Sequence, residues 1–301
     1  QLLEAFEPRV WRGTQHLRAA SVAVNFTTRR VHLTNVFSTD DPMVVTRAIG
    51  PKTARAIEPY HFAAPPTVRL EGTVPMRGNA GADLRVEVSG GPFNWWKFNA
   101  PQISGTVRWE EGLVTLTNVS LAFYGGGAQG WGVFDAGPAP GTACRFAVAA
   151  TNVNFHALMA DLTTPTNRLE GTLDAALTVS DANSDDWRSW NGHGHARLRD
   201  GWIWAIPVFG VLSGPLDGIL PGLGSSRVTS GSAQFVLTNG VIFSDDLEWR
   251  APAMRLQYVG TADLQGQVNA TVQAELLRDT WLVGRIVSLA LWPVSKILEF
   301  K

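Results

Sequence analysis

Residues 254–276 read MRLQYVGTADLQGQVNATVQAEL, and their alternation of apolar and polar side chains predicts the fold. Every second residue from Leu256 to Leu276 is apolar or glycine, whereas the residues between them are polar except for Val259. Because side chains point to opposite faces along a strand, the segment predicts β structure with one apolar and one hydrated face. Clean alternation indicates antiparallel strands, since parallel strands are usually covered on both faces.

The same alternation recurs along most of the chain. The residues that share a face in this way are Val68, Leu70, Gly72 and Val74; Leu84, Val86 and Val88; Ile103, Gly105, Val107 and Trp109; and Leu169, Gly171, Leu173, Ala175, Leu177 and Val179. Clusters of Gly, Asn and Asp separate these segments, as hairpin turns require. We therefore expect many antiparallel strands joined by short turns.

Two short motifs repeat. RLEGT occurs at 69–73 and 168–172, and LTN occurs at 33–35, 116–118 and 237–239. We interpret each LTN as a strand end with a tight turn, in which Asn adopts the left-handed conformation. Together the repeats favour stacked β units over a single closed fold.

Few helices are expected. The candidate segments are 42–58, with one or two short helices broken at Gly50-Pro51; 155–162; 206–223, where Gly and Pro favour short turns of helix or loop; and 279–300. The last of these has the strongest pattern, an amphipathic C-terminal helix that Asp279 caps and Pro293 kinks or breaks.

Composition excludes several classes of protein. The 301 residues carry a net charge of −1 and only 17% charged residues, so no basic surface indicates nucleic-acid binding. The single cysteine, Cys144, allows no intrachain disulfide and no cysteine-rich metal site. No apolar run is long enough to predict a membrane-spanning helix. Because the sequence starts at Gln1 without a signal peptide, we expect an excerpt of a longer protein whose anchor or export signal lies upstream.

Sequence motifs for catalysis are weak. Gly125, Gly127 and Gly130 match G-x-G-x-x-G, but a dinucleotide site needs a helix to follow and the strand-like WGVFD follows instead. This pattern favours a hairpin in which the glycines, which have no side chain, keep the backbone slender where the two strands cross. His193 and His195 share one strand face, yet no third metal ligand has clear spacing, so ordinary surface histidines are expected. We predict no catalytic residue, no metal site and no cofactor, hence no enzyme.

The tryptophans allow two interpretations. They lie at 95–96, 187, 190, 202, 204, 249, 281 and 292. Either they form an aromatic set that contacts lipid, or they pack in the core and along strand edges. The sequence alone leaves both open.

An apolar sheet face must be covered, by a second sheet, by closure of the sheet, or by a ligand in a curled trough. Long repeated strands with few charges on one side favour the trough. We therefore predict a mainly β protein of repeated antiparallel strands curled into an elongated open groove, with a few short helices and a C-terminal amphipathic helix. The predicted groove lining comprises Leu169, Leu173, Leu177, Val179, Leu256, Tyr258, Leu264, Val268, Val272 and Leu276.

Several of these segments resemble a known family. ISGTVRWEEGLVTLTNVSLAFYGGGAQGWGVFD (103–135), NVNFHALMADL (152–162) and NRLEGTLDAALTVS (167–180) are similar to the repeating units of the AsmA and TamB superfamily, and 231–301 resembles its AsmA-like C-terminal region. The resemblance implies an inner-membrane-anchored, periplasm-facing protein of a Gram-negative-type envelope. It also implies a β groove that moves phospholipid toward the outer membrane or supports outer-membrane assembly.

With this resemblance we divide the chain into three segments. Residues 1–65 are expected to form N-terminal strands with a short helical insertion, 66–165 a first β-groove unit, and 166–301 an AsmA-like C-terminal unit with the terminal helix. The expected partners are phospholipid acyl chains, a membrane reached through an anchor outside this segment, and other envelope proteins, but not nucleic acid.

Two other functions remain as alternatives. The first is a structural or assembly module whose exposed strand edges pair with client proteins. The second is a secreted carbohydrate-active β protein, which strand alternation disfavours. An open apolar face, a filled core with bare edges, or carboxylates clustered beside tryptophan would distinguish the three.

Overall fold

The structure is a computed structural model that describes residues 1–49, 58–78, 80–135, 137, 140–163, 169–202, 228–252, 254–276 and 296–297. As predicted, the protein is mainly β and its strands pair antiparallel. The chain divides into two compact units, of which unit 1 comprises 1–123 with 128–146 and unit 2 comprises 124–127 with 147–301. The three segments expected from the sequence stay a prediction.

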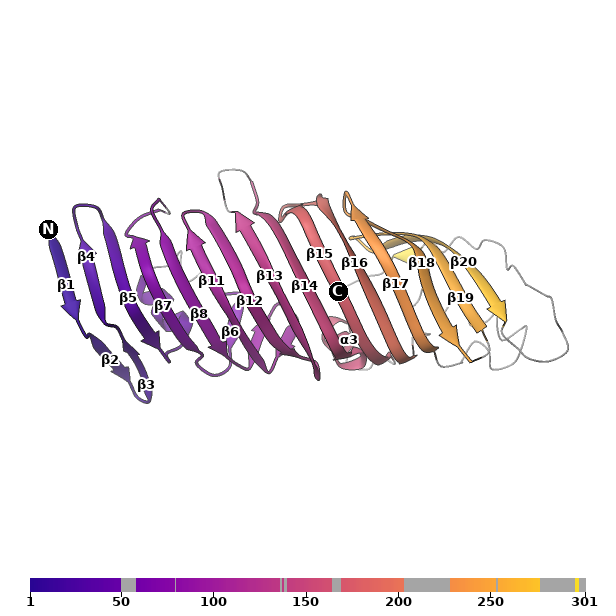
Figure 1. Cartoon of the computed structure of the whole chain (residues 1–301), viewed down its shortest axis with the longest axis horizontal. Helices are drawn as coiled ribbons and strands as arrows, with labels where there is room; N and C mark the ends of the chain where they lie inside the picture. The colour runs from indigo at the N-terminus through magenta and orange to yellow at the C-terminus, as the bar shows by residue number, and fades with distance from the viewer. Residues whose placement is uncertain are drawn as a thin grey trace. The chain divides into compact units, whose positions relative to one another are not determined.

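Unit 1 is built on a ladder of antiparallel strands (Figure 1). These are β1 (Leu2–Phe6), β2 (Arg9–Arg12), β3 (Gln15–Arg18), β4 (Ser21–Asn25), β5 (Arg30–Ser38), β7 (Thr67–Pro75), β8 (Asp83–Gly90), β11 (Gln102–Glu110) and β12 (Leu113–Phe123). Strand β1 pairs with β4 and β2 with β3, and both lead through β5, β7, β8 and β11 to β12. Among the described residues the first and last strands do not pair, so the sheet is open.

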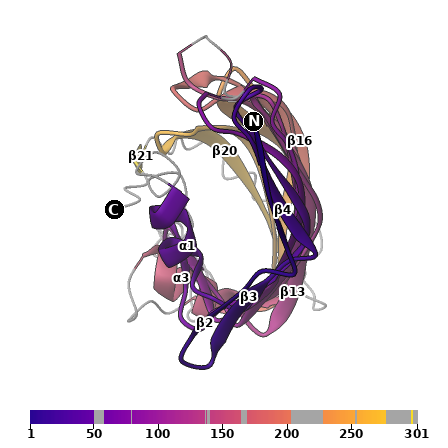
Figure 2. The same ribbon diagram turned by 90° about the vertical axis from the view of Figure 1, so that its left-hand side faces the viewer.

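A smaller sheet accompanies this ladder. It consists of β6 (Tyr60–Phe62), β9 (Phe93–Trp95) and β10 (Phe98–Ala100). The ring of Phe98 lies 5.9 Å from that of Phe123 at the end of β12, which attaches the small sheet to the ladder. Strands β3 and β4, which follow each other in the chain, lie at an angle to each other. Helix α1 (Pro42–Ile49) lies on the inner side of this bend (Figure 2).

Unit 2 is an antiparallel ladder in chain order. It contains β15 (Glu170–Asn183), β16 (Asp186–Trp202), β17 (Val228–Thr238), β18 (Val241–Ala251), β19 (Met254–Asp263), β20 (Gln267–Leu276) and β21 (Lys296–Ile297). Strands β13 (Gly126–Asp135) and β14 (Ala143–Asn154) precede it and contain the division between the units. Helix α3 (Phe155–Leu162) follows β14 directly, and the Asn154 side chain caps it by accepting from the Ala157 N–H.

Residues 254–276 form a hairpin rather than one continuous strand. Strands β19 and β20 flank a turn that holds Leu264 and Gly266, and the Asp263 carboxylate accepts from the backbone N–H of Gln267 at 2.8 Å. The prediction that Leu264 belongs to the apolar face is wrong, because it lies in the turn and is 40% exposed. Tyr258 nevertheless pairs with Val272 across the hairpin, so the apolar positions on both strands share one face.

The predicted left-handed conformation of the Asn in each LTN motif is confirmed, but the predicted tight turn is found at only one of the three motifs. Asn35, Asn118 and Asn239 have φ of 47°, 52° and 51°, so all three adopt the left-handed conformation. Only Asn239 lies in a tight turn, where it joins β17 to β18 together with Gly240. Asn35 and Asn118 lie inside β5 and β12, where the pairing register shifts, and are therefore β-bulges. A bulge inserts one residue and exchanges the faces of all later side chains in the strand.

The two RLEGT repeats share a backbone feature. Gly72 has φ of 130° and Gly171 has φ of 132°, a conformation that L side chains rarely adopt. Each lies at a register shift, the first between β5 and β7 and the second between β15 and β16. The two RLEGT segments therefore share a backbone conformation as well as a sequence motif.

The helix predictions have mixed outcomes. Helix α3 has the predicted bounds, and α1 begins at the predicted Pro42, where the Asp41 carboxylate accepts from the Met43 N–H. Residues 50–57 and the predicted 206–223 segment lie outside the described residues. So does most of 279–300, although Lys296–Ile297 form β21 instead of helix and pair with β20. No helix in the described part of the chain is long and apolar enough to cross a membrane.

Candidate functional site

The candidate site in unit 1 is the apolar face of its ladder. One row of directly paired residues crosses six strands, namely Val22, Leu33, Gly72, Leu84, Trp109 and Val114. A second row contains Val36, Leu70, Val86, Val107 and Leu116. The nonglycine members of both rows are only half-buried, apart from Val36 at 4% exposure. Unit 1 therefore presents aliphatic side chains that its own described residues cover incompletely.

The equivalent face in unit 2 is packed. Its longest row, which crosses β15 to β20, contains Leu173, Leu198, Gly231, Trp249, Leu256 and Ala274. Phe155 of α3 packs with Leu173 and Trp249 against a core of Leu198 and Val228, which are 3% and 2% exposed. Helix α3 therefore covers part of the apolar face of unit 2.

A glycine on this face makes room for an aromatic ring. Gly231 of β17 lies opposite Trp249 of β18, and a Cβ at Gly231 would come 2.0 Å from the indole ring. Any side chain at Gly231 would displace the ring. At this position Trp249 packs within the apolar face, which favours the core interpretation of that tryptophan.

The structure places most predicted lining residues on the apolar face of unit 2, and many of them are fully buried. The exposed fractions are 5% for Leu169, 0% for Val179, 1% for Leu256, 3% for Tyr258 and 6% for Val272, whereas Leu173, Leu177 and Val268 are half-buried. Strand β20 includes Leu276, whose side chain lies outside the described part of the structure. Whether any of these residues lines a lipid path stays a prediction.

The more exposed apolar surface was missed as a site, although its signal was present in the sequence. Val86, Val88 and Val107 alternate with polar residues as regularly as the unit 2 positions do. Alternation identifies an apolar face but does not report what covers it. The difference between the two faces therefore becomes visible only in the structure.

The polar face of unit 2 carries charged networks. Arg199 donates to Asp174 Oδ2 at 2.8 Å and to Asn152 Oδ1 at 2.9 Å, which links β14, β15 and β16. On β18, Glu248 accepts from Arg250 and from Arg255, whose Nε lies 2.6 Å from Oε2. Burial acts to raise the pKa of Glu248, but the hydrogen bonds and charges of the two arginines together lower it. These networks fix the hydrated side of the sheet.

Tyr258 lies on the opposite, apolar face of the same ladder. Its side chain is 3% exposed, and burial raises the pKa of its phenol. The group is therefore neutral across the physiological pH range. A neutral, deeply placed phenol suits packing in this face.

The weak catalytic and metal motifs have structural explanations. Tyr124 and Gly125 have φ of 45° and 82° and form the turn that joins β12 to β13. Strand β13 follows this turn, so the helix that a nucleotide site requires is not there. His193 and His195 lie exposed on the polar face of β16. Within the described ranges, no group of three His, Cys, Asp or Glu side chains is arranged to hold a metal ion.

Comparisons with protein-family models, curated proteins and solved structures find no match to this chain. The resemblance to the AsmA and TamB superfamily accordingly rests on the sequence segments quoted above and stays a prediction.

Proposed function

We propose that the chain is a non-enzymatic segment of an AsmA-like protein that binds phospholipid along an apolar β groove. The observation that carries the proposal is the half-buried aliphatic face of unit 1, exemplified by Leu84, Val86 and Val107. Six paired strands contribute to this face, which gives it the width to accept an extended acyl chain.

The mechanism is transfer of acyl chains from water to an apolar surface. Each methylene that leaves water contributes roughly 0.8 kcal/mol, so partial contact along a chain of many methylenes is sufficient for binding. Paired charges such as Arg108 and Glu110, 2.8 Å apart, keep the opposite face hydrated. A surface of this kind holds lipid without directional bonds, which permits the lipid to slide along the strands.

The resemblance extends the proposal to a cellular role. A groove segment of this family would conduct phospholipid between membranes or support outer-membrane biogenesis, in a periplasm-facing protein anchored in the inner membrane. Acyl chains, the membrane that carries the anchor and other envelope proteins are the proposed partners.

The test compares a negative charge on each face of one strand. Val86 lies on the apolar face of β8, and Ser89 lies exposed on its polar face, so Val86→Asp and Ser89→Asp are a matched pair. Native mass spectrometry of the 301-residue chain should detect co-purified phospholipid in the parent and in Ser89→Asp. Val86→Asp should lose it while keeping the parent circular dichroism spectrum. Equal lipid content in both folded variants would contradict the proposal.

A second candidate function is assembly through the edge of unit 1. Strands β1 and β2 are exposed throughout, and Phe6, Val10 and Trp11 are 73%, 61% and 66% exposed. An exposed edge strand offers unpaired backbone groups to a strand of another protein. The Ala19 N–H donates to the Pro8 carbonyl and hydrogen-bonded pairs alternate along the hairpin, so the Val10 N–H faces β3 and the Trp11 N–H faces outward. Trp11→Pro removes this outward donor from β2, so it should weaken capture of a client β strand, whereas Trp11→Thr should preserve it. Equal capture by both variants would remove this candidate.

A further inference from the structure

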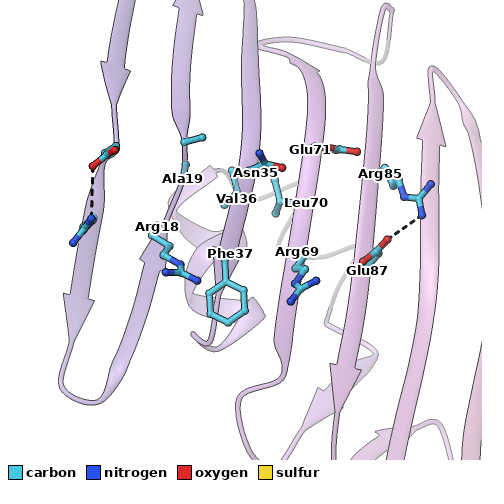
Figure 3. Close-up of a pocket in the computed structure, with 13 residues that line it drawn as sticks. Arg18, Ala19, Asn35, Val36, Phe37, Arg69, Leu70, Glu71, Arg85 and Glu87 are labelled. Carbon is cyan, nitrogen blue, oxygen red and sulfur yellow. Dashed lines mark hydrogen bonds and ion pairs between the residues drawn. The ribbon is translucent and has the colours of Figure 1, made fainter.

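A row of arginines crosses the polar face of unit 1 beside a single phenylalanine (Figure 3). Arg9 pairs with Arg18, Arg18 with Phe37, and Phe37 with Arg69, which joins β2, β3, β5 and β7. Side chains that are directly opposite in an antiparallel pair have Cβ atoms about 5 Å apart. Three guanidinium groups and one ring are therefore gathered on four neighbouring strands.

The bulge at Asn35 places Phe37 in this row. Before the bulge, Val31 and Leu33 of β5 lie on the apolar face. With regular alternation Phe37 would follow them there, but the extra residue sends Val36 to the apolar side and Phe37 to the polar side. An aromatic ring among arginines on a hydrated face is thus a product of the local backbone and not of hydrophobic patterning.

The ring fixes the position of a cation. The Cζ atom of Arg18 lies 5.1 Å from the centroid of the Phe37 ring, and the His16 ring lies 5.4 Å from the same centroid. Arg18 and Arg69 flank this ring from opposite sides (Figure 3). A guanidinium held over a ring is already ordered and keeps its N–H donors directed outward. The side chain therefore loses less conformational entropy when it binds an anion.

Three carboxylates, Glu7, Glu71 and Glu87, lie around the row. Glu7 lies 3.6 Å from Arg9, and both side chains are strongly exposed. Glu87 lies directly opposite Arg69 and accepts from Arg85 at 2.9 Å, and Glu71 lies directly opposite Arg85. Four arginines, Arg9, Arg18, Arg69 and Arg85, outnumber these three carboxylates, so the region keeps one net positive charge.

Two arginines consequently remain available to a ligand. None of the ion pairs among the described residues includes Arg18 or Arg69. Arg9 and Arg18 are directly opposite each other, and like charges in that arrangement destabilise a sheet. A bound anion would offset this repulsion, so the arrangement favours an anionic ligand.

A depression of about 590 Å³ surrounds the row, with Arg9, Arg18, Phe37 and Arg69 among its lining residues. We propose that this depression binds an anion of the phosphate class, held by Arg18 and Arg69 beside the Phe37 ring with Arg9 at the rim. A tetrahedral phosphate offers three oxygens that accept from guanidinium groups on different strands, whereas a carboxylate has two oxygens in one plane, which suit a single guanidinium. The site lies on the hydrated face and does not depend on lipid binding by the apolar face.

Phosphate can reach this site free in solution or as part of a lipid headgroup. The first arm of the test measures the melting temperature of the 301-residue chain with sodium phosphate or glycerol phosphate against sodium chloride at equal ionic strength. The second arm measures sedimentation with phosphatidylglycerol vesicles. Stabilisation in the first arm assigns a soluble ligand, and vesicle binding without it assigns a headgroup.

The variants are Arg18→Gln and Arg69→Gln, with Arg108→Gln as the matched control. Arg108 is exposed on the polar face of unit 1 but pairs with Glu110, and it does not line the depression. Arg69→Gln should weaken phosphate binding about tenfold or more, since a charge-assisted hydrogen-bond pair is lost. Arg69→Lys keeps the positive charge but lacks the paired N–H donors of a guanidinium, so its phosphate affinity should be intermediate. Arg108→Gln should bind phosphate as the parent does.

A further readout separates binding from a merely structural role. In chloride alone, Arg18→Gln should melt close to the parent temperature, because the removed repulsion from Arg9 offsets the lost contact with the Phe37 ring. With phosphate present, the same variant should melt below the parent. Equal responses of Arg69→Gln and Arg108→Gln in both arms, or no response of the parent to any phosphate compound, would overturn the proposal.

Discussion

The apolar faces of the two units are built from the same strand pattern but differ in how far they are covered. In unit 1, Leu84, Val86 and Val107 are half-buried, whereas in unit 2 Leu256 and Val179 are 1% and 0% exposed. Strand alternation therefore specifies an apolar face without specifying whether that face is a core or a binding surface. This difference is the basis on which we propose lipid binding for unit 1 and structural packing for much of unit 2.

The largest effect is expected where the face is fully covered. Leu256→Asp places a charge at a 1% exposed position, next to Trp249 on the paired strand. An unpaired buried charge costs about 4 kcal/mol or more, so unit 2 should unfold or melt far below the parent. Val86→Asp should cost only about 1–2 kcal/mol, because its side chain reaches water. Chemical denaturation of both variants measures the difference, and equal losses would remove the distinction between the units.

The contribution of α3 is expected to be smaller. Phe155→Ala removes the ring that packs on Leu198 and Val228. Loss of a partly buried ring should cost about 2–3 kcal/mol and leave the apolar face of unit 2 more exposed. Urea denaturation of the variant and the parent measures the loss. An unchanged free energy of unfolding in Phe155→Ala would show that α3 does not cover this face.

Part of the fold was predictable because it depends on local rules. Antiparallel strands follow from period-two alternation, and helix α3 follows from a short apolar segment after the capping residue Asn154. The bulge at Asn35 was not predictable as such, since left-handed Asn serves turns and bulges alike. Its consequence, Phe37 on the polar face, depends on which residues of β7 pair with β5. Whether an apolar face is covered likewise depends on contacts between residues that are distant in sequence.

A smaller effect is expected on the polar face of unit 2. The pKa of Glu248 is lowered in the folded state, so its contribution to stability is present above its unfolded pKa of about 4.5 and is lost as the pH falls through the folded value. Glu248→Gln should lower the free energy of unfolding at pH 7 by about 1 kcal/mol and flatten the pH dependence below 4.5. Glu275→Gln, whose partner Arg255 lies 3.7 Å away, should have almost no effect. Thermal melts between pH 3 and pH 7 measure both, and a parallel pH profile for Glu248→Gln and the parent would contradict the assignment.

The smallest perturbation gives the most direct test that the apolar face of unit 1 binds acyl chains. Val86→Cys and Ser89→Cys, each combined with Cys144→Ser, place a bimane label on opposite faces of β8. Phospholipids with brominated acyl chains quench a fluorophore only at close contact. Strong quenching at position 86 and little at position 89 is the expected result, and equal quenching at both positions, or none at 86 under conditions where lipid co-purifies, would contradict it.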